Sequence, residues 1–326
     1  METVGSVAAE LSGNGRRDTT LRVCVLPGNP GVAEYYADFV EALQLELGPS
    51  ASVCGKSAAH QCAVNQSLTP AFCALPAVGL LGHSRVPLYA RTFDLEEQVA
   101  HVVRFVDELT AEEGNAAPLV LVGHSIGAWL ALRALRERPD RVQCVTGLYP
   151  FLMNNSASRL QRVLAAAVKL RPLVWLVAQL TSLLAILPVR WRRALLGPVL
   201  RGVGGLGDTA VDITCDWLRA ASVHNTCTLG AAEFAALAAE PDYASLRQFA
   251  ARVSLFYGGV EDIWGPPHHA EAVRRNAPGL SVTEDDTFGH MFCTTREGSR
   301  YVAAATAALL RSMTSRAAPV AAGLSG

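Results

Sequence analysis

The segment that most constrains the fold is a short apolar run, Leu119–Val122, which leads directly into the pentapeptide 123–127, Gly-His-Ser-Ile-Gly. A stretch rich in Ala and Leu, with helical spacing, follows and ends near Pro139. An apolar run of this length that ends at glycines is typical of a buried strand entering a tight turn. The sequence therefore predicts a strand, a sharp turn and a helix, with Ser125 at the turn.

The same alternation of strands and helices recurs along the chain. The expected strands lie at 21–26, 77–81, 119–122, 142–148, 253–257 and 280–283. Helical patterns occupy 34–47, the stretch after Asp94, and 299–311, and Asp94 and Glu97 have the spacing of a capping box. Strands alternating with helices predict an α/β fold, with a mostly parallel sheet covered on both faces.

The 326 residues suffice for one large domain that carries an insertion. Residues 1–20 lack an apolar segment, so they are not expected to be a secretory signal, and we expect them to be disordered. The core is expected at 21–150 and 251–313, with a loop insertion at 48–76. A helical, apolar cap is expected at 151–250, and a flexible tail at 314–326.

Charge and cysteine content exclude some classes of protein. The formal net charge of −1 argues against a nucleic-acid binder, because phosphate neutralisation needs a basic excess. None of the eight cysteines forms a C-x-x-C pair, and several lie in apolar runs. We therefore expect free thiols in a reducing compartment, and neither a metal site nor a bound cofactor.

Ser125 stands in a G-x-S-x-G pattern, which places a serine on a strained turn between a strand and a helix. Gly123 and Gly127 are small enough for that close approach. The backbone N–H of Ile126 could then donate a hydrogen bond to an oxyanion. A similar triplet at 82–84, Gly-His-Ser, lacks the second glycine, so we do not expect a nucleophile there.

A serine nucleophile needs a histidine base and a carboxylate that orients it, in the chain order Ser, acid, His. Asp262 and His290 each follow a predicted strand, and Glu261 is an alternative acid. His268 and His269 are expected to begin a helix. His124 is expected to point to the opposite face from its neighbour Ser125.

The first predicted strand ends in the loop 27–31, Pro-Gly-Asn-Pro-Gly. In this kind of fold, a loop after an early strand supplies a second oxyanion donor, and the N–H of Asn29 is our candidate. The alternative is a rigid turn that has no catalytic role.

The cap contains the most apolar segment of the chain. Residues 172–188 are almost wholly apolar but shorter than the roughly 20 residues that span a bilayer as a helix. Arginines and tryptophan flank this segment, which we interpret as an apolar hairpin that inserts partly into a lipid surface, through about 160–200. A buried cap helix over an apolar pocket is the alternative.

Together these motifs resemble the lipid droplet-associated hydrolase family, from about residue 21 to about 312. The matching pieces are the loop 27–31 with the aromatic residues that follow it, the pentapeptide 123–127, the segment 257–264, and His290 with Phe292. Two departures are the insertion at 48–76 and the short stretch before Leu21, where a first hairpin would be absent or reduced.

The resemblance implies an α/β-hydrolase fold and a triad of Ser125, Asp262 and His290. It also implies a sterol ester or acylglycerol as substrate, and location on lipid droplets, with the endoplasmic reticulum or the cytosolic face of membranes as the alternative. A lipid droplet-binding protein with little or no activity, and an acyltransferase or thioesterase on the same fold, stay open as alternatives.

Overall fold

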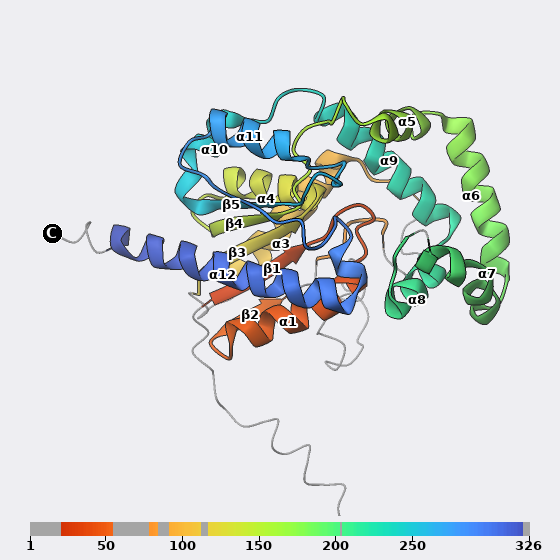
Figure 1. Cartoon of the computed structure of the whole chain (residues 1–326), viewed down its shortest axis with the longest axis horizontal. Helices are drawn as coiled ribbons and strands as arrows, with labels where there is room; N and C mark the ends of the chain where they lie inside the picture. Colours follow the sequence, from red (N-terminus) through yellow and green to blue (C-terminus); the bar gives the residue numbers. More distant parts are fainter. Residues whose placement is uncertain (1–20, 55–77, 84–90, 112–116, 203, 322–326) are drawn as a thin grey trace, which may run out of the picture.

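Six parallel strands form one sheet in the computed structural model, which describes residues 21–54, 78–83, 91–111, 117–202 and 204–321. The strands are β1 (Leu21–Leu26), β2 (Ala51–Cys54), β3 (Leu119–His124), β4 (Val142–Leu148), β5 (Val253–Tyr257) and β6 (Ser281–Glu284). Their order across the sheet is β2-β1-β3-β4-β5-β6, and each neighbouring pair is parallel. The carboxyl ends of all six strands therefore lie along one edge (Figure 1).

Both faces of the sheet are covered, which explains why its central strands are continuous apolar runs. All six residues of β3 are buried. Val120 and Val122 pack into the cluster on one face, and Leu119 and Leu121 pack into the cluster on the other. The predicted parallel α/β sheet is confirmed.

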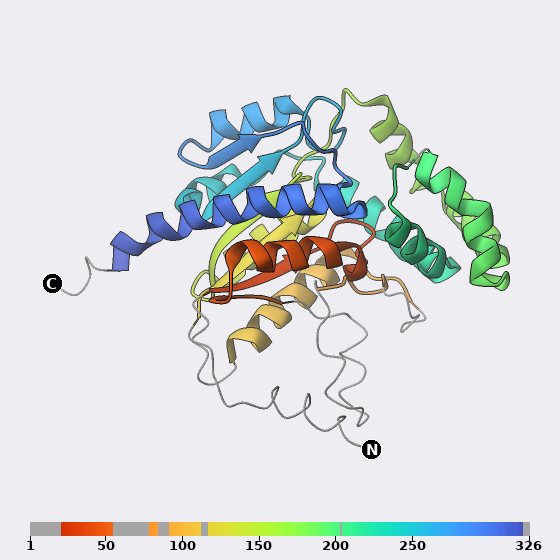
Figure 2. The same ribbon diagram turned by 60° about the horizontal axis from the view of Figure 1, so that its bottom comes forward.

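On one face lie the short 3₁₀ turn η2 (Ala33–Tyr36), α1 (Ala37–Leu47) and α12 (Arg296–Ala321). Helices α1 and α12 run side by side across that face (Figure 2). The opposite face carries α3 (Leu95–Ala111), α4 (Ile126–Glu137), α10 (Tyr243–Gln248) and α11 (Pro267–Asn276). The capping box of α3 is confirmed, because Glu97 N–H donates to Asp94 Oδ1 and Asp94 N–H to Glu97 Oε2, both at 2.9 Å.

Between β4 and β5 the chain leaves the sheet and forms the cap, which comprises α5 (Arg159–Ala167), α6 (Arg171–Ile186), α7 (Val189–Gly202), α8 (Asp208–Trp217) and α9 (Ala220–Ala236). These helices extend outward from the carboxyl edge of the sheet (Figure 1). Buried Asn225 of α9 joins the cap to the core, since its side chain accepts from Phe93 N–H at 3.1 Å and donates to Arg91 O at 3.3 Å.

Two parts of the predicted core differ from the structure. β2 lies inside the segment 48–76 that we predicted to be an inserted loop, and it pairs with β1 at the edge of the sheet. The strand expected at 77–81 does not form. Instead, Val78 and Leu80 donate single hydrogen bonds to Val25 O and Gly31 O, at 2.9 and 3.0 Å, which do not build a ladder.

The cap and the C-terminus also differ from expectation. The apolar hairpin expected at 172–188 is one helix, α6, and the chain turns only at Leu187 and Pro188. In the predicted tail 314–326, α12 continues to Ala321. Residues 1–20 and 55–77, on which two further expectations fall, lie outside the described residues.

Within the described ranges, no single helix is long and apolar enough to cross a membrane, whereas α5 and α6 pass that test together, by length and composition, but are bent by 85°. The five cysteines whose thiols the structure describes, Cys24, Cys144, Cys215, Cys227 and Cys293, form no disulfide.

Candidate active site

Ser125 lies at the turn between β3 and α4 with φ 55° and ψ −123°, a backbone conformation that is costly for any residue except glycine. The two flanking glycines make the turn possible. A Cβ on Gly123 would lie 2.2 Å from Gly127 O, and one on Gly127 would lie 2.5 Å from Leu26 O. The predicted strand, sharp turn and helix are therefore present, with the Ser125 hydroxyl at the carboxyl edge of the sheet.

Asp262 and His290 meet at the same edge, in the loops after β5 and β6. His290 Nδ1 lies 3.1 Å from both carboxylate oxygens of Asp262. Burial by itself would raise the pKa of Asp262, but the nearby His290 and the hydrogen bonds from His290 and Trp264 N–H lower it. The other acid that the sequence offered, Glu261, is exposed, and the described residues show no hydrogen bond or ion pair between it and His290.

Ser125, His290 and Asn29 line one cavity of about 540 Å³ that the cap covers. Its other walls are mostly apolar and come from the core loops and from α5, α7, α8 and α9, among them Phe151, Leu164, Leu206, Trp217, Phe234 and Trp264. The described part of the chain shows no hydrogen bond between the Ser125 hydroxyl and His290. In serine hydrolases without substrate this contact is often long, and it tightens in the complex.

The loop 27–31 lies against Ser125. A Cβ on Gly28 would be 2.9 Å from the Cβ of Ser125. Gly28 N–H is already bonded to the Tyr36 hydroxyl at 3.0 Å, whereas Asn29 N–H has no hydrogen-bond partner among the described residues. Ile126 is the first residue of α4, so its N–H has no partner within the helix. Two backbone donors thus remain available beside Ser125.

His124 lies closer to the site than the sequence suggested. It shares the α1 and α12 face with Val122, as strand alternation requires. Because β3 ends here, that face adjoins the cavity, and the His124 ring lies 4.8 Å from the His290 ring. Burial and the neighbouring His290 hold the pKa of His124 well below its ordinary value, so its ring is neutral.

Tyr36 joins His124 to the loop 27–31. Its hydroxyl accepts from Gly28 N–H, which leaves its own proton for His124 Nδ1 at 2.6 Å. On the other side of the loop, Gly31 N–H donates to His83 Nδ1 at 3.0 Å. Burial lowers the pKa of His83 to about 3, so the ring stays neutral and can accept. His83 thus supports the loop 27–31.

The sequence did not predict a role in the site for three residues near the cavity. Tyr36 was visible only as an aromatic residue in a helical stretch, and His124 was expected only to point to the opposite face from Ser125. The third is Glu233 of α9, which lines the cavity and is only 4% exposed. Its flanking residues, Ala231, Ala232 and Phe234, are the one available signal, because an isolated acid within an apolar helical segment can face inward.

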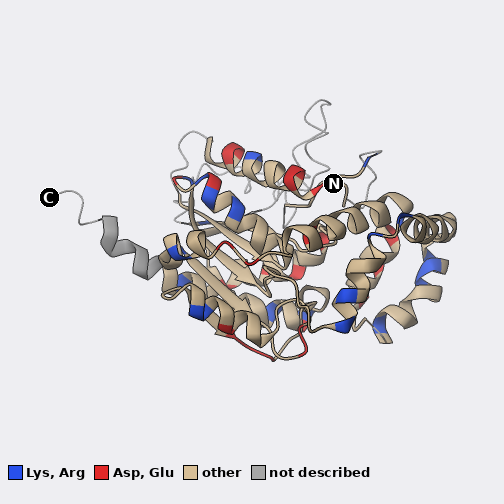
Figure 3. Cartoon of the chain, turned by 90° about the horizontal axis from the view of Figure 1, so that it is seen from above, with Lys and Arg blue, Asp and Glu red and all other residues tan. Residues whose placement is uncertain are grey.

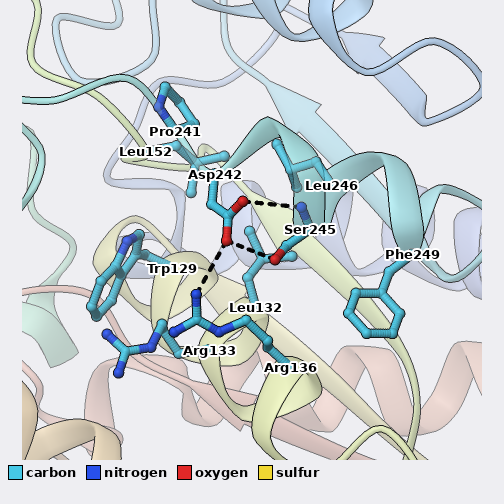
Figure 4. Close-up of a pocket in the computed structure, with 10 residues that line it drawn as sticks. All are labelled: Trp129, Leu132, Arg133, Arg136, Leu152, Pro241, Asp242, Ser245, Leu246 and Phe249. Atoms are coloured by element: carbon cyan, nitrogen blue, oxygen red, sulfur yellow. Dashed lines mark hydrogen bonds and ion pairs between the residues drawn. The ribbon is translucent and has the colours of Figure 1, made fainter.

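A second, smaller hollow lies between α4 and α10 (Figure 4). Asp242 accepts hydrogen bonds there from Arg136 at 3.1 Å and from Ser245 N–H at 3.0 Å. Its accessible space is about 60 Å³. Because Asp242 caps α10 and is fully paired, we assign this hollow a structural role.

Solved structures with the same architecture define the class of protein. A carboxylesterase from Nitrososphaera gargenis aligns with a TM-score of 0.57 at 12% identity, covering 91% of this chain and 92% of that one. A monoacylglycerol lipase from Paleococcus ferrophilus aligns with a TM-score of 0.51 at 16% identity, covering 90% and 94%. At such identities the likeness concerns the fold alone, and that fold is the α/β-hydrolase fold.

Sequence comparison then gives the family. The family model described as lipid-droplet associated hydrolase matches residues 19–293, so this chain belongs to that family and is a hydrolase. A lipid droplet-associated hydrolase of Gallus gallus is 23% identical over 78% of this chain and 74% of its own length. Those of Dictyostelium discoideum and Drosophila melanogaster are 23% and 28% identical, over 42% and 39% of this chain and 40% and 38% of their own lengths.

Proposed function

We propose that this chain hydrolyses carboxylic esters of lipids, with Ser125 as nucleophile, His290 as general base and acid, and Asp262 as the carboxylate that orients His290. Ser125 Oγ attacks the acyl carbon while its proton passes to His290 Nε2. His290 gives that proton to the leaving alcohol, which departs as the acyl-enzyme forms. A water molecule, deprotonated by His290, then attacks the acyl carbon, and the acid leaves as Ser125 regains its proton.

The N–H groups of Asn29 and Ile126 are the donors that we assign to the oxyanion of each tetrahedral intermediate. Neither N–H group has a hydrogen-bond partner in the part of the chain that the structure describes, and Ile126 stands at the N-terminus of α4, where the helix dipole favours negative charge. Removing one such donor typically costs about 100- to 1000-fold in kcat.

The observation that carries this proposal is the strained Ser125 in the cavity that also contains the paired His290 ring. The left-handed φ of 55° costs free energy, and strain of this kind persists mainly where function requires it. Asp262 and His290 lie in loops far from Ser125 in the sequence, yet their 3.1 Å contact lies at the same edge of the sheet.

We propose further that the substrate is met on a lipid droplet or membrane surface. Helices α5 to α7 expose many large apolar side chains, including Leu173, Trp175, Leu176, Leu180, Leu183, Ile186, Trp191 and Leu195. A monomeric protein rarely exposes so large an apolar face to water alone. The names of the relatives include association with lipid droplets, in agreement with this face.

The charge of the same helices fits an anionic lipid surface. No Asp or Glu occurs between Asp140 and Asp208, while eight Lys and Arg residues lie within 159–201. Figure 3 shows these basic positions along the cap helices. Arg193 and Arg201 pair with acids of α8, whereas Lys169, Arg171 and Arg190 have no acidic partner in the part of the chain that the structure describes.

The test of the catalytic proposal is covalent labelling by a fluorophosphonate, followed by hydrolysis of a panel of sterol, glycerol and short-chain esters. We expect the wild-type protein to be labelled and Ser125→Ala to be neither labelled nor active. Equal labelling of both proteins would exclude Ser125 as the nucleophile. Product analysis in the presence of an added alcohol would reveal an acyltransferase as a new ester in place of the free acid.

A further inference from the structure

Three polar atoms in the wall of the cavity have no hydrogen-bond partner among the described residues. They are Glu233 Oε1, Thr226 Oγ1 and Asn29 Oδ1, and each is fully enclosed. All three residues line the cavity that contains Ser125, whose other walls are mainly apolar. Enclosed polar groups without partners cost folding free energy, so three of them together require an explanation.

These residues form one continuous patch, which we call the polar wall. Thr226, Gly230 and Glu233 lie four and three residues apart, so they share one face of α9. Asn29 lies opposite this face and donates from Nδ2 to Thr226 O at 3.0 Å. A Cβ on Gly230 would be 3.6 Å from Asn29 Nδ2, so the glycine lets the helix and the loop approach closely.

The protonation state of Glu233 decides what the polar wall can bind. Burial raises the pKa of Glu233 to about 8, although an interaction with Asn29 opposes that rise. At neutral pH the carboxyl group is therefore mostly uncharged, and it can donate as well as accept a hydrogen bond. The Thr226 hydroxyl can also do both, while Asn29 Oδ1 can only accept.

We propose that the polar wall binds a free hydroxyl group on the alcohol part of the ester, close to the ester bond. A hydroxyl is both donor and acceptor, as the wall requires, whereas an ether or ketone oxygen only accepts. The wall is close to the reacting carbon, because Asn29 follows Gly28, which lies against Ser125. This inference rests on the proposed ester hydrolysis and narrows its substrate to partly acylated polyols such as monoacylglycerols, in preference to sterol esters.

The experiment compares two esters of the same acid and of alcohols with the same carbon skeleton. One is 1-decanoylglycerol, which has two free hydroxyls, and the other is propyl decanoate, which has none. For the wild-type protein we expect kcat/KM for the glycerol ester to exceed that for the propyl ester. Glu233→Leu should lower this ratio by about 10- to 100-fold, the range for losing one or two hydrogen bonds to substrate.

Two further variants separate recognition from packing. Glu233→Gln keeps a neutral donor and acceptor of nearly the same shape, so most of the ratio should be retained. Glu240→Leu removes an exposed acid beyond the end of α9 and should leave the ratio at its wild-type value. A wild-type ratio near one, or the same ratio in the wild-type protein and Glu233→Leu, would overturn the proposal.

Failure of the proposed hydrolysis would be recognised separately, as absence of fluorophosphonate labelling together with no turnover of either ester. The polar wall would then be tested by binding, with 1-O-decylglycerol and decyl propyl ether as uncleavable probes. Trp217 and Trp264 line the cavity, so their fluorescence reports occupancy. Tighter binding of the glycerol ether that Glu233→Leu abolishes supports the proposal, and equal binding of both ethers overturns it.

Discussion

Helices α4 and α6 are both rich in apolar residues, yet they place them in opposite surroundings. Seven of the 12 residues of α4 are buried against the sheet, including Leu130 and Leu135. Of the 16 residues of α6, only Ala178 and Thr181 are buried, and Leu180 and Leu183 are 53% and 63% exposed. Helix α4 therefore buries most of its apolar side chains inside the protein, whereas α6 leaves most of its own exposed.

The comparison separates the candidate catalytic residues from the surface that we propose to bind lipid. Ser125, Asp262 and His290 stand on loops of the rigid sheet, which fixes their geometry. Helix α6 contributes few buried side chains to the protein, so its exposed apolar face is available to contact a lipid surface. Burying one leucine fully in an apolar medium yields about 1.5–3 kcal/mol, so a few of these residues suffice for attachment to a lipid surface.

The largest expected effect comes from the core. Ser125→Ala should lower kcat/KM for any ester by about 10⁴-fold or more, because no nucleophile remains. The same variant should partition onto lipid droplets as the wild-type protein does. Ester turnover by purified protein and sedimentation with droplets measure the two properties, and a loss of droplet binding in Ser125→Ala would contradict the division between core and cap.

The next largest effect concerns binding of the cap to lipid vesicles. Leu180→Glu combined with Leu183→Glu should weaken binding to lipid vesicles by about 100-fold, since two apolar side chains are lost from the contact. Hydrolysis of a short, water-soluble ester should stay within about twofold. Leu45→Glu is the matched control, because Leu45 is 77% exposed on α1, away from the cap, and this change should leave vesicle binding as it is.

A smaller effect on stability and activity is expected from Tyr36, which supports the loop 27–31. Tyr36→Phe leaves both Gly28 N–H and His124 Nδ1 buried without the hydroxyl that joins them. We expect a loss of about 1–3 kcal/mol in stability and about 10-fold in kcat/KM. Tyr35→Phe, which removes only the 2.7 Å contact with Thr214, is the control. Equal kinetic effects of the two variants would show that the Gly28 contact does not matter for catalysis.

The last effect concerns the stability of the folded protein and depends on Glu233, which lies on the side of α9 that lines the cavity. The folded protein keeps the Glu233 proton up to a pKa of about 8, while the unfolded chain releases it near the ordinary value of 4.5. The folded state thus binds more protons between these values, so stability should fall as pH rises from 5 to 8.

Glu233→Gln should remove this dependence. Thermal unfolding should show the Tm advantage of Glu233→Gln over the wild-type protein growing by roughly 5 °C between pH 5 and 8. A constant difference between the two proteins across this range would mean that Glu233 is ionised in the folded state.

Much of the core could be predicted because its signals are local. Four of the six strands in the described residues, β1, β3, β4 and β5, are mainly apolar runs that end at glycine or proline turns, and parallel strands bring their loops to one edge. The sequence therefore predicted Asp262 and His290 at the same edge of the sheet as Ser125. β2 was missed because a four-residue edge strand, Ala-Ser-Val-Cys, lacks a clear apolar period.

The polar wall could not be predicted in the same way. Helix α9 has an almost uniform composition of small residues, so its sequence does not reveal which face meets the loop 27–31. The role of Glu233 depends on contact with Asn29, about 200 positions away in the chain. His124 was misjudged because strand alternation describes the two faces of the sheet, whereas the cavity adjoins both at the strand ends.

The cap leaves the sheet after β4 and returns to β5, and these two strands are direct neighbours. Because the two strands are parallel, the chain leaves β4 at the carboxyl edge of the sheet and crosses back through α10 to the amino end of β5, so the length of the cap can change at the carboxyl edge while both strands stay in register. Insertions and deletions between them can be accommodated without moving Ser125, Asp262 or His290. A lineage can therefore alter the exposed apolar face of the cap by exchanging a single continuous segment, while these three side chains keep their places on the sheet.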